Sequence, residues 1–406
     1  MRHVAIIGGG VAGLTCAFYL KRRGIESTVF EAREKPGGRD GSVLYFLAPD
    51  LFRNTFQLIR DLELSGDVIS ITPHAGQLYR GRVYHHRVAS ATGLLAFKGL
   101  GITDKALLTR MAYLLSRYSS RLDFHHPERG LEFDNETVAA FVKRELSQNV
   151  LNYVAGPLIS TLFFFGSEET SLWLYLVLAK HMYNTRMSTV RGGVGSLVDR
   201  LAGSSKVLPG QGVRDISAQS NGYVVNGRQF SDVVVAVPGD QVLRIGGIDA
   251  LLSIADREFF RDCWYQRTVS VNVSTNDPVD RNCYAVSIPR VEGFSASTIS
   301  FHDYIDPSAV PDGKGLLTIT GGGPDVGSDK LLEELRAVYS VEPESVDIVE
   351  HPSGTPKFPP GRYRQIHEFN KRDRMPGLFF CGDYLLGPFV EAAVSTGVRA
   401  AQAIQG

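Results

Sequence analysis

The sequence predicts an α/β protein built on a parallel β-sheet, and the first 31 residues carry most of the evidence. An apolar run over 4–7 is followed by the glycine-rich stretch 8–13 and then by apolar residues at helical spacing. A second apolar run, 27–30, ends at the acidic Glu31. Strand, glycine-rich turn, helix and strand in this order form a βαβ unit, in which the two strands lie parallel.

The glycine-rich stretch has the spacing Gly-x-Gly-x-x-Gly, and each glycine meets a separate steric need. Gly8 allows a tight turn, Gly10 lets the backbone approach a pyrophosphate, and Gly13 leaves room for the helix against the strand. The pyrophosphate would lie at the N-terminus of the helix, beside Val11 and Ala12. These five residues are predicted to bind a dinucleotide.

The acid after the second strand fits the same site. The intervening helix is predicted to end near Lys21 and Gly24. Glu31 lies 18 residues after Gly13, close to the usual separation of about 20. Its carboxylate can accept hydrogen bonds from both ribose hydroxyls and would repel a 2'-phosphate. The pattern therefore favours FAD or NAD over NADP.

The residues after this acid distinguish FAD from NAD. Glu31-Ala32-Arg33, followed by Gly37-Gly38-Arg39, resembles the second signature of the flavin-containing amine oxidoreductase superfamily, which includes monoamine oxidases, protoporphyrinogen oxidases and phytoene-desaturase-like enzymes. The resemblance implies FAD and places Ala32, Arg33, Gly38 and Arg39 at the cofactor. The paired glycines let the backbone come close, and the guanidinium offers a forked donor to phosphate oxygens.

Two later stretches resemble other parts of the same FAD domain. The stretch 377–383 is similar to its last strand, which implies that Gly382 and Asp383 lie at the cofactor, with the Asp383 carboxylate accepting from the ribityl or pyrophosphate side. The stretch 207–213 resembles a strand of the domain, with Val213 where family members contact adenine through the backbone.

The C-terminal stretch 387–397 resembles the family's helix whose N-terminus points at the flavin pyrimidine ring. The resemblance places Phe389, Val390 and Ala393 at the cofactor. The positive end of the helix would favour negative charge on the reduced ring.

The resemblance also implies a domain organisation. A Rossmann-like FAD-binding domain of the GR2 type would be assembled from three segments, and a discontinuous α+β substrate domain from two. Apolar spacing predicts that the first substrate segment is mainly helical and the second mainly strand. The FAD domain would comprise 1–75, 190–245 and 352–406, and the substrate domain 76–189 and 246–351.

The chain departs from the family just after Arg39. Residues 40–42 pass directly into a predicted strand over 43–47, where family members usually form a short hairpin first. Ala48-Pro49 would then take the place of a family dipeptide near the isoalloxazine ring.

The composition argues against a nucleic-acid partner. Among 406 residues, 43 Lys and Arg are matched by 43 Asp and Glu, so the formal net charge is zero. A nucleic-acid-binding protein needs a basic surface. The four cysteines are widely spaced and contain no Cys-x-x-Cys pair, so we predict buried packing residues in a reducing compartment.

The sequence predicts no membrane-spanning helix. The most apolar region, 151–183, is broken by Gly156-Pro157 and by Glu168-Glu169, whereas a span needs about 20 uninterrupted residues. Because a strand already begins by residue 3, we predict no leader and a cytoplasmic protein. For the helical segment 107–122, peripheral membrane contact is one alternative. The others are a face packed in the core and a face exposed to solvent.

Three positions weaken an assignment as a simple amine oxidase. Monoamine-oxidase-like members carry a lysine near the flavin, and this chain has no lysine between Lys206 and Lys314. The same enzymes use two tyrosines as an aromatic cage for the amine, and by resemblance Gly354 and Phe389 stand at these two positions. Ser353 stands where a flavin-attaching cysteine would be. The resemblance therefore implies non-covalent FAD and a substrate other than a simple amine.

Two aromatic runs suggest what that substrate is. The runs 162–165 and 172–178 would either line an apolar pocket or form a buried helical core. We predict an FAD-dependent oxidoreductase that takes a hydride from a small apolar or polycyclic substrate, with oxygen or another acceptor restoring the flavin. An amine or amino-acid oxidase and a non-redox flavin-dependent isomerase are the alternatives, and no catalytic residue is assigned.

The histidines give weak signals. His85-His86 and His125-His126 are adjacent pairs, whose side chains point apart on a strand or helix, so no metal site is predicted. His302, next to Asp303, is a candidate base only.

Overall fold

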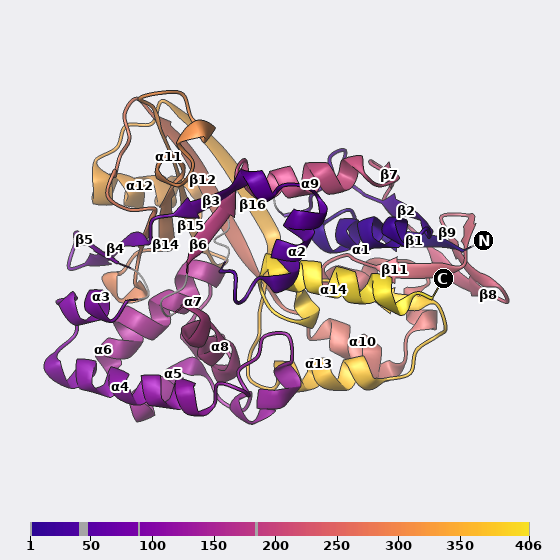
Figure 1. Cartoon of the computed structure of the whole chain (residues 1–406), viewed down its shortest axis with the longest axis horizontal. Helices are drawn as coiled ribbons and strands as arrows, with labels where there is room; N and C mark the ends of the chain where they lie inside the picture. Colours follow the sequence, from indigo (N-terminus) through magenta and orange to yellow (C-terminus); the bar gives the residue numbers. More distant parts are fainter. Residues whose placement is uncertain (1, 40–47, 88–89, 183–185, 406) are drawn as a thin grey trace.

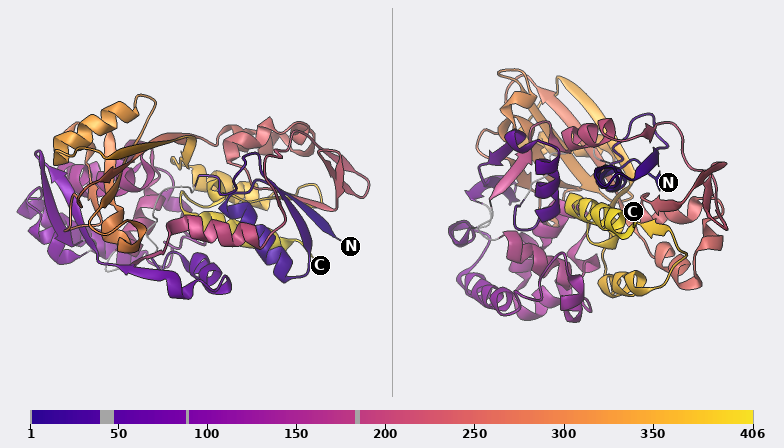
Figure 2. Two further views of the ribbon diagram at one scale, coloured as in Figure 1. Left: turned by 90° about the horizontal axis from the view of Figure 1, so that it is seen from above. Right: turned by 45° about the vertical axis from the view of Figure 1, so that its right-hand side comes forward.

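The computed structural model describes residues 2–39, 48–87, 90–182 and 186–405, and Figure 1 shows its arrangement. A parallel sheet lies at one end of the molecule and a larger sheet at the other, with helices packed around and between them. The two termini lie close together beside the parallel sheet in both Figures 1 and 2, and Arg2 Nη1 donates to the Gln405 carbonyl at 2.7 Å.

The parallel sheet contains five strands in the order β17-β11-β1-β2-β7, and every pair is parallel. The predicted βαβ unit is confirmed, because β1 and β2 pair over their full lengths. The strands are β1 (His3–Ile7), β2 (Glu26–Phe30), β7 (Val207–Leu208), β11 (Asp232–Val235) and β17 (Leu378–Phe380).

The predicted strand over 207–213 is wrong in length, because β7 ends at Leu208. Pro209 follows, and it has no N–H to donate to a sheet. Gly210 then adopts φ +66°, a left-handed conformation that turns the chain away from the sheet.

Two helices pack closely on the parallel sheet. They are α1 (Val11–Arg22) and α14 (Val390–Ala403). A Cβ on Gly397 would lie 2.4 Å from the Ala12 carbonyl oxygen, so glycine is needed where the helices cross. Around them lie α2 (Arg53–Asp61), α9 (Gly193–Gly203), α10 (Ile254–Arg261) and α13 (Arg362–Lys371).

The larger sheet contains seven strands in the order β16-β12-β15-β14-β13-β4-β5. Its neighbours are antiparallel except for β4 and β13, which are parallel. Helices α11 (His302–Ile305) and α12 (Ser328–Tyr339) accompany it. The strands are β4 (His74–Tyr79), β5 (Arg82–Arg87), β12 (Tyr265–Thr275), β13 (Ala285–Ser287), β14 (Ala296–Phe301), β15 (Gly315–Gly322) and β16 (Ser345–Pro356).

Strands β12 to β15 and the first part of β16 lie within 246–351 as expected, but α10, α11 and α12 lie there too, so the segment mixes strand and helix. Two predicted domain boundaries fall inside strands of the larger sheet, at 75/76 in β4 and at 351/352 in β16. The exact division into domains stays a prediction.

Helices gather between 91 and 182, as expected (Figure 1). The aromatic run 172–178 lies in α8 and is buried in the core, so its structural interpretation is confirmed. These helices are α3 (Ala91–Ala96), α4 (Ile102–Arg117), α5 (Val138–Glu145), α6 (Gln148–Val150), α7 (Gly156–Phe163) and α8 (Leu172–Met182).

Two small sheets complete the fold. One is the antiparallel pair of β3 (Val68–Ile71) and β6 (Met187–Val190). The other contains β8 (Ile216–Gln219), β9 (Gly222–Val225) and β10 (Arg228–Phe230).

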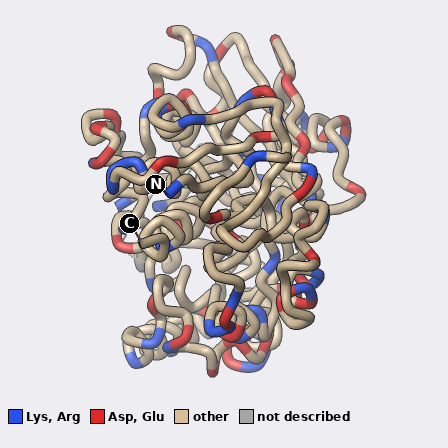
Figure 3. The backbone as a smooth tube through the Cα atoms, turned by 90° about the vertical axis from the view of Figure 1, so that its right-hand side faces the viewer, with Lys and Arg blue, Asp and Glu red and all other residues tan. Residues whose placement is uncertain are grey.

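Three expectations from composition can be compared with the structure. All four cysteines are buried and outside any disulfide, as expected. Figure 3 shows basic residues interspersed with acidic ones along the chain. Within the described residues, no helix is both long and apolar enough to cross a membrane.

Candidate cofactor site

The glycine-rich loop between β1 and α1 has the close contacts that its spacing predicts. A Cβ on Gly13 would lie 2.1 Å from the Gly8 carbonyl oxygen, and one on Gly8 would lie 2.8 Å from the Ala236 carbonyl oxygen. At Gly10, just before α1, a Cβ would meet no atom within 4 Å. The N-terminus of α1 therefore presents an open backbone surface that fits a pyrophosphate.

Glu31 is held against this loop by two backbone groups. Its Oε2 accepts from the Gly9 N–H at 2.8 Å, and its Oε1 accepts from the Arg33 N–H at 2.8 Å. Each carboxylate oxygen has a further lone pair for a ribose hydroxyl. The residues present therefore fit the adenosine half of a dinucleotide.

The second glycine pair packs directly on the first loop. The Gly37 N–H donates to the Gly9 carbonyl at 2.9 Å, and a Cβ on Gly38 would lie 3.5 Å from the Gly10 Cα. Arg33 Nη1 donates to the Gly38 carbonyl at 2.7 Å. The two sequence signatures thus form one continuous surface.

The segment after β7 lies beside the ribose acid. The Gln211 N–H donates to the Glu31 carbonyl at 2.8 Å, which aligns 210–213 with 31–33. Val213 follows two residues later and is half-buried. Its proposed contact with adenine fits this position.

Arg39 reaches the signature at the far end of the chain. Its Nη2 forms an ion pair with Asp383 Oδ2 at 2.8 Å, and its Nη1 donates to the Gly354 carbonyl at 2.7 Å. The guanidinium lies 5.5 Å from the centroid of the Tyr265 ring. The Arg39 guanidinium therefore contacts side chains and backbone from separate segments of the chain. Its contact with phosphate oxygens stays a prediction.

The turn after β17 is fixed to α14. The Gly382 N–H donates to Thr396 Oγ1 at 2.9 Å. At the start of α14, the Phe389 carbonyl accepts from Ala393 N–H at 3.4 Å, with Val390 as the first helical residue. Asp383 and this helix end therefore lie on the same side of the parallel sheet, at the carboxyl ends of its strands, where such folds bind ligands.

Glu391 is a functional candidate that the sequence reasoning did not single out. It is fully buried in the first turn of α14, where it accepts from the Asn54 N–H at 2.9 Å and the Thr55 N–H at 2.8 Å. His125 Nε2 lies 3.5 Å from Glu391 Oε1, and burial is the main cause that lowers the pKa of this imidazole. The sequence did hold a signal for Glu391, because an acidic residue stands there among apolar residues of the C-terminal helix.

An aromatic cluster surrounds the start of α14. The Phe389 ring centroid lies 5.2 Å from Phe124, 5.2 Å from Phe163 and 6.2 Å from Phe52. Phe163 stacks on Phe165 at 5.5 Å. Through Phe163, the run 162–165 therefore packs against Phe389, which is the second predicted cage position.

Comparison with known proteins decides the family. The model of the flavin containing amine oxidoreductases matches residues 11–405. The chain belongs to this family. It is therefore a flavin-dependent oxidoreductase that acts on small-molecule substrates, which confirms the predicted fold and enzyme class.

The similarity to individual relatives differs in extent. Coproporphyrinogen III oxidase of Bacillus subtilis (strain 168) is 22% identical, covering 98% of this chain and 97% of its own. Protoporphyrinogen oxidase 2, chloroplastic/mitochondrial, of Arabidopsis thaliana is 28% identical over 39% of this chain and 32% of its own. The structure of cyclohexylamine oxidase from Brevibacterium oxydans IH-35A superimposes with a TM-score of 0.77 at 16% identity, covering 99% and 98% of the chains.

Two of the positions that the sequence analysis compared with amine oxidases, Gly354 and Ser353, lie on β16. A Cβ on Gly354 would lie 2.4 Å from Thr268 Oγ1, so an aromatic side chain has no room there as the chain is packed. Ser353 Oγ donates to Asp240 Oδ2 at 2.5 Å. Neither position supplies a cage ring or a thiol.

The histidine proposed as a base lies in the core of the seven-stranded sheet. His302 is buried, its Nε2 lies 2.6 Å from Thr318 Oγ1, and burial lowers its pKa to about 4. Asp303 Oδ1 accepts from the Leu316 N–H at 3.1 Å. These contacts give both residues structural roles.

One predicted region cannot be compared. Residues 40–47, with the predicted strand 43–47, lie outside the described residues. Ala48 is buried and accepts a hydrogen bond from the Leu51 N–H at 2.9 Å, just ahead of α2.

Proposed function

We propose that this family member binds FAD non-covalently. The proposal is supported by Glu31 and the Gly10 surface, which suit the pyrophosphate and the adenosine that FMN lacks. The side chain at 353 is a serine hydroxyl bonded to Asp240, so no thiol stands there to attach the flavin. When bound, FAD supplies two-electron oxidation of a carbon framework.

We propose further that the substrate is an apolar, polycyclic framework, with porphyrinogens as the first class to test. The observation that carries this proposal is the cluster of Phe389 with Phe52, Phe124 and Phe163 at the start of α14. Flat aromatic faces pack on flat substrate rings, whereas an alkylamine gains most from a cation–π cage. The full-length similarity to a coproporphyrinogen III oxidase supports the same choice.

The chain's own groups would then act by positioning and by charge. The half-buried Phe389 ring would hold the substrate and exclude water beside α14. The helix N-terminus would stabilise negative charge that develops beyond it. Glu391, by bonding α2, would keep that helix end in place.

We propose oxygen as the electron acceptor and the cytoplasm as the location. Four buried, free cysteines agree with a reducing compartment. The acceptor is tested by the same assay as the substrate.

The test is a steady-state assay in air with FAD-reconstituted protein. Coproporphyrinogen III and protoporphyrinogen IX are supplied in parallel with benzylamine, cyclohexylamine and putrescine. We expect fluorescent porphyrin and hydrogen peroxide to rise together with a porphyrinogen, above its spontaneous oxidation, and no peroxide with the amines. Peroxide from an amine alone would reject the substrate proposal.

A further inference from the structure

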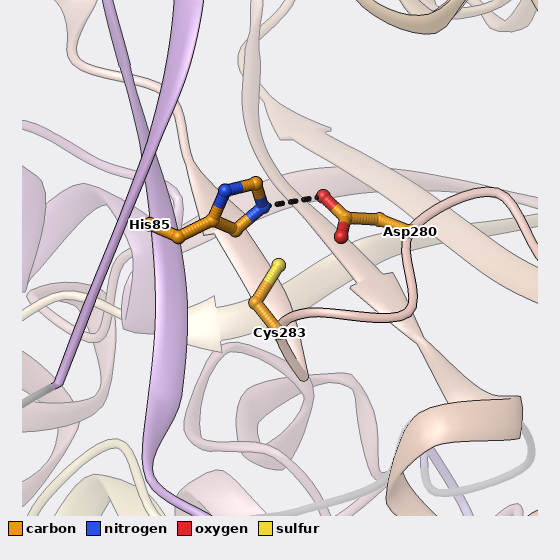
Figure 4. A group of neighbouring side chains, drawn as sticks. All are labelled: His85, Asp280 and Cys283. Carbon is orange, nitrogen blue, oxygen red and sulfur yellow. Dashed lines mark hydrogen bonds and ion pairs between the residues drawn. The ribbon is translucent and has the colours of Figure 1, made fainter.

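Three side chains of metal-ligand type meet in the seven-stranded sheet. His85 lies on β5, and Asp280 and Cys283 lie in the loop before β13 (Figure 4). Their ligand atoms all lie within 4.8 Å of one another, and His85 Nε2 is 2.7 Å from Asp280 Oδ2. In Figure 4 the imidazole faces the carboxylate, and the thiol points toward the space between them.

The sheet has a specific reason to bring these residues together. Strand β4 lies between β5 and β13, and its Gly76 pairs with His85 on one side and Val286 on the other. A Cβ on Gly76 would lie 2.7 Å from both Val83 and Val286. Glycine therefore removes the side chain that would separate the two outer strands, and His85 reaches the loop 280–283.

The donor set has a clear metal preference. Thiolate, imidazole and carboxylate together suit Zn²⁺, whereas Ca²⁺ and Mg²⁺ prefer oxygen ligands alone. One thiolate and one carboxylate would neutralise the charge of a divalent ion. Asp280 and Cys283 are buried, while the His85 side chain is 37% exposed and leaves an entry path from solvent.

The surroundings support ligation. Tyr339 donates its hydroxyl hydrogen to Asp280 Oδ2 at 2.7 Å, and the Asn282 N–H donates to Asp280 Oδ1 at 2.9 Å. Outer contacts of this kind orient metal-binding carboxylates.

We propose that His85, Asp280 and Cys283 bind one Zn²⁺ ion, with water as the fourth ligand. On binding, the S–H bond of Cys283 breaks, its proton passes to solvent, and a Zn–S bond forms with no change in oxidation state. The hydrogen bond between His85 Nε2 and Asp280 opens, and His85 binds the ion through Nε2 with its proton moved to Nδ1. The proposal differs from the expectation drawn from the adjacent histidines, because its other two ligands, Asp280 and Cys283, are distant in sequence from His85.

The test measures zinc in protein that carries no histidine tag, after loading with Zn²⁺ and removal of excess ion. We expect about one zinc per chain by elemental analysis, and less than a tenth of that in Cys283→Ser and in His85→Ala. His86→Ala, a change to the neighbouring residue of the same strand, is the matched control and should keep its zinc. X-ray absorption should show one sulfur at about 2.3 Å and nitrogen or oxygen ligands at about 2.0–2.2 Å.

The proposal would be overturned if the wild type held no more zinc than Cys283→Ser, or if the zinc site contained no sulfur. If the cysteine variant does not fold, Co²⁺ added to the wild type decides instead: a thiolate-to-cobalt absorption band supports the site, and its absence rejects it. Tyr339→Phe should fold and bind zinc about 10–100-fold more weakly, because it removes one outer contact. Each readout is independent of the flavin reaction.

Discussion

The glycine-rich end of the cofactor site and the aromatic cluster differ in the sequence separation of the residues that contact each other. Gly9 and Glu31, which bond each other at the cofactor site, are 22 residues apart. Phe389, in contrast, packs on Phe124 and Phe163 from a separate segment of the chain. The glycine-rich end of the cofactor site is specified by local turn chemistry and the aromatic cluster by tertiary packing, so mutations should separate cofactor binding from substrate oxidation.

The largest effect is expected at Gly13. Gly13→Ala places a Cβ 2.1 Å from the Gly8 carbonyl oxygen, so the loop must open and FAD binding should be lost. Strain of this kind typically costs about 1–3 kcal/mol of stability. The flavin absorbance of the purified protein and its urea midpoint measure both effects.

Gly195→Ala in α9 is the matched control. A Cβ there would meet nothing within 4 Å, so FAD binding should be unchanged and stability should rise by about 0.5–1 kcal/mol. Equal flavin content in the two variants would break the local account of the cofactor site.

The next effect is at Glu31. Glu31→Gln replaces one carboxylate oxygen by an NH₂ group that cannot accept from a backbone N–H. Hydrogen bonds to charged groups contribute about 1.5–3 kcal/mol, so FAD should bind about 10–150-fold more weakly. Flavin fluorescence quenching measures the Kd, with the exposed Glu26→Gln as control. An unchanged Kd in Glu31→Gln would remove this acid from the site.

The substrate side is tested at Phe389. Phe389→Ala leaves the backbone at the start of α14 in place, so FAD should stay bound. The variant should lower kcat/KM for the accepted porphyrinogen about tenfold, because aromatic pairs contribute about 0.5–1.5 kcal/mol each. Phe389→Tyr keeps the ring and should retain most of the activity. A loss of flavin in Phe389→Ala would show that the two sites are not separable.

A separate effect concerns the pH dependence of stability and the sheet around His302. Burial lowers the folded-state pKa of His302 to about 4, below its ordinary 6.5, so the unfolded chain binds the proton more tightly. The stabilisation is complete above pH 6.5 and is lost as pH falls toward 4, by at most about 3 kcal/mol. Urea unfolding between pH 7 and 4.5 should show this decline, and His302→Asn should flatten it. A decline of equal slope in His302→Asn would assign it to other groups.

The same contrast explains how much the sequence could predict. Strands β1 and β2 and helix α1 follow from apolar runs and glycine spacing, and the structure has them at the expected places. Strand β7 was overestimated because the resemblance was carried over 207–213 as one strand, although Pro209 and Gly210 end the pairing at Leu208. Local patterns therefore predicted elements better than their ends.

Contacts across the chain were beyond local reasoning. The resemblance placed Arg39 at the cofactor, but only the fold shows its ion pair with Asp383. The pair of Glu391 with α2 and the group around His85 likewise depend on which segments become neighbours. Such partners lie far apart in sequence, so no spacing rule finds them.

The central claim is that this flavin-dependent oxidoreductase dehydrogenates a polycyclic framework rather than an amine. The most direct test is anaerobic reduction of the FAD-loaded protein in a stopped-flow spectrophotometer, where oxygen chemistry plays no part. The account predicts loss of the oxidised flavin absorbance on mixing with coproporphyrinogen III or protoporphyrinogen IX, and no loss with cyclohexylamine or putrescine. Rapid bleaching by an amine, with the flavin unchanged by both porphyrinogens, would contradict it.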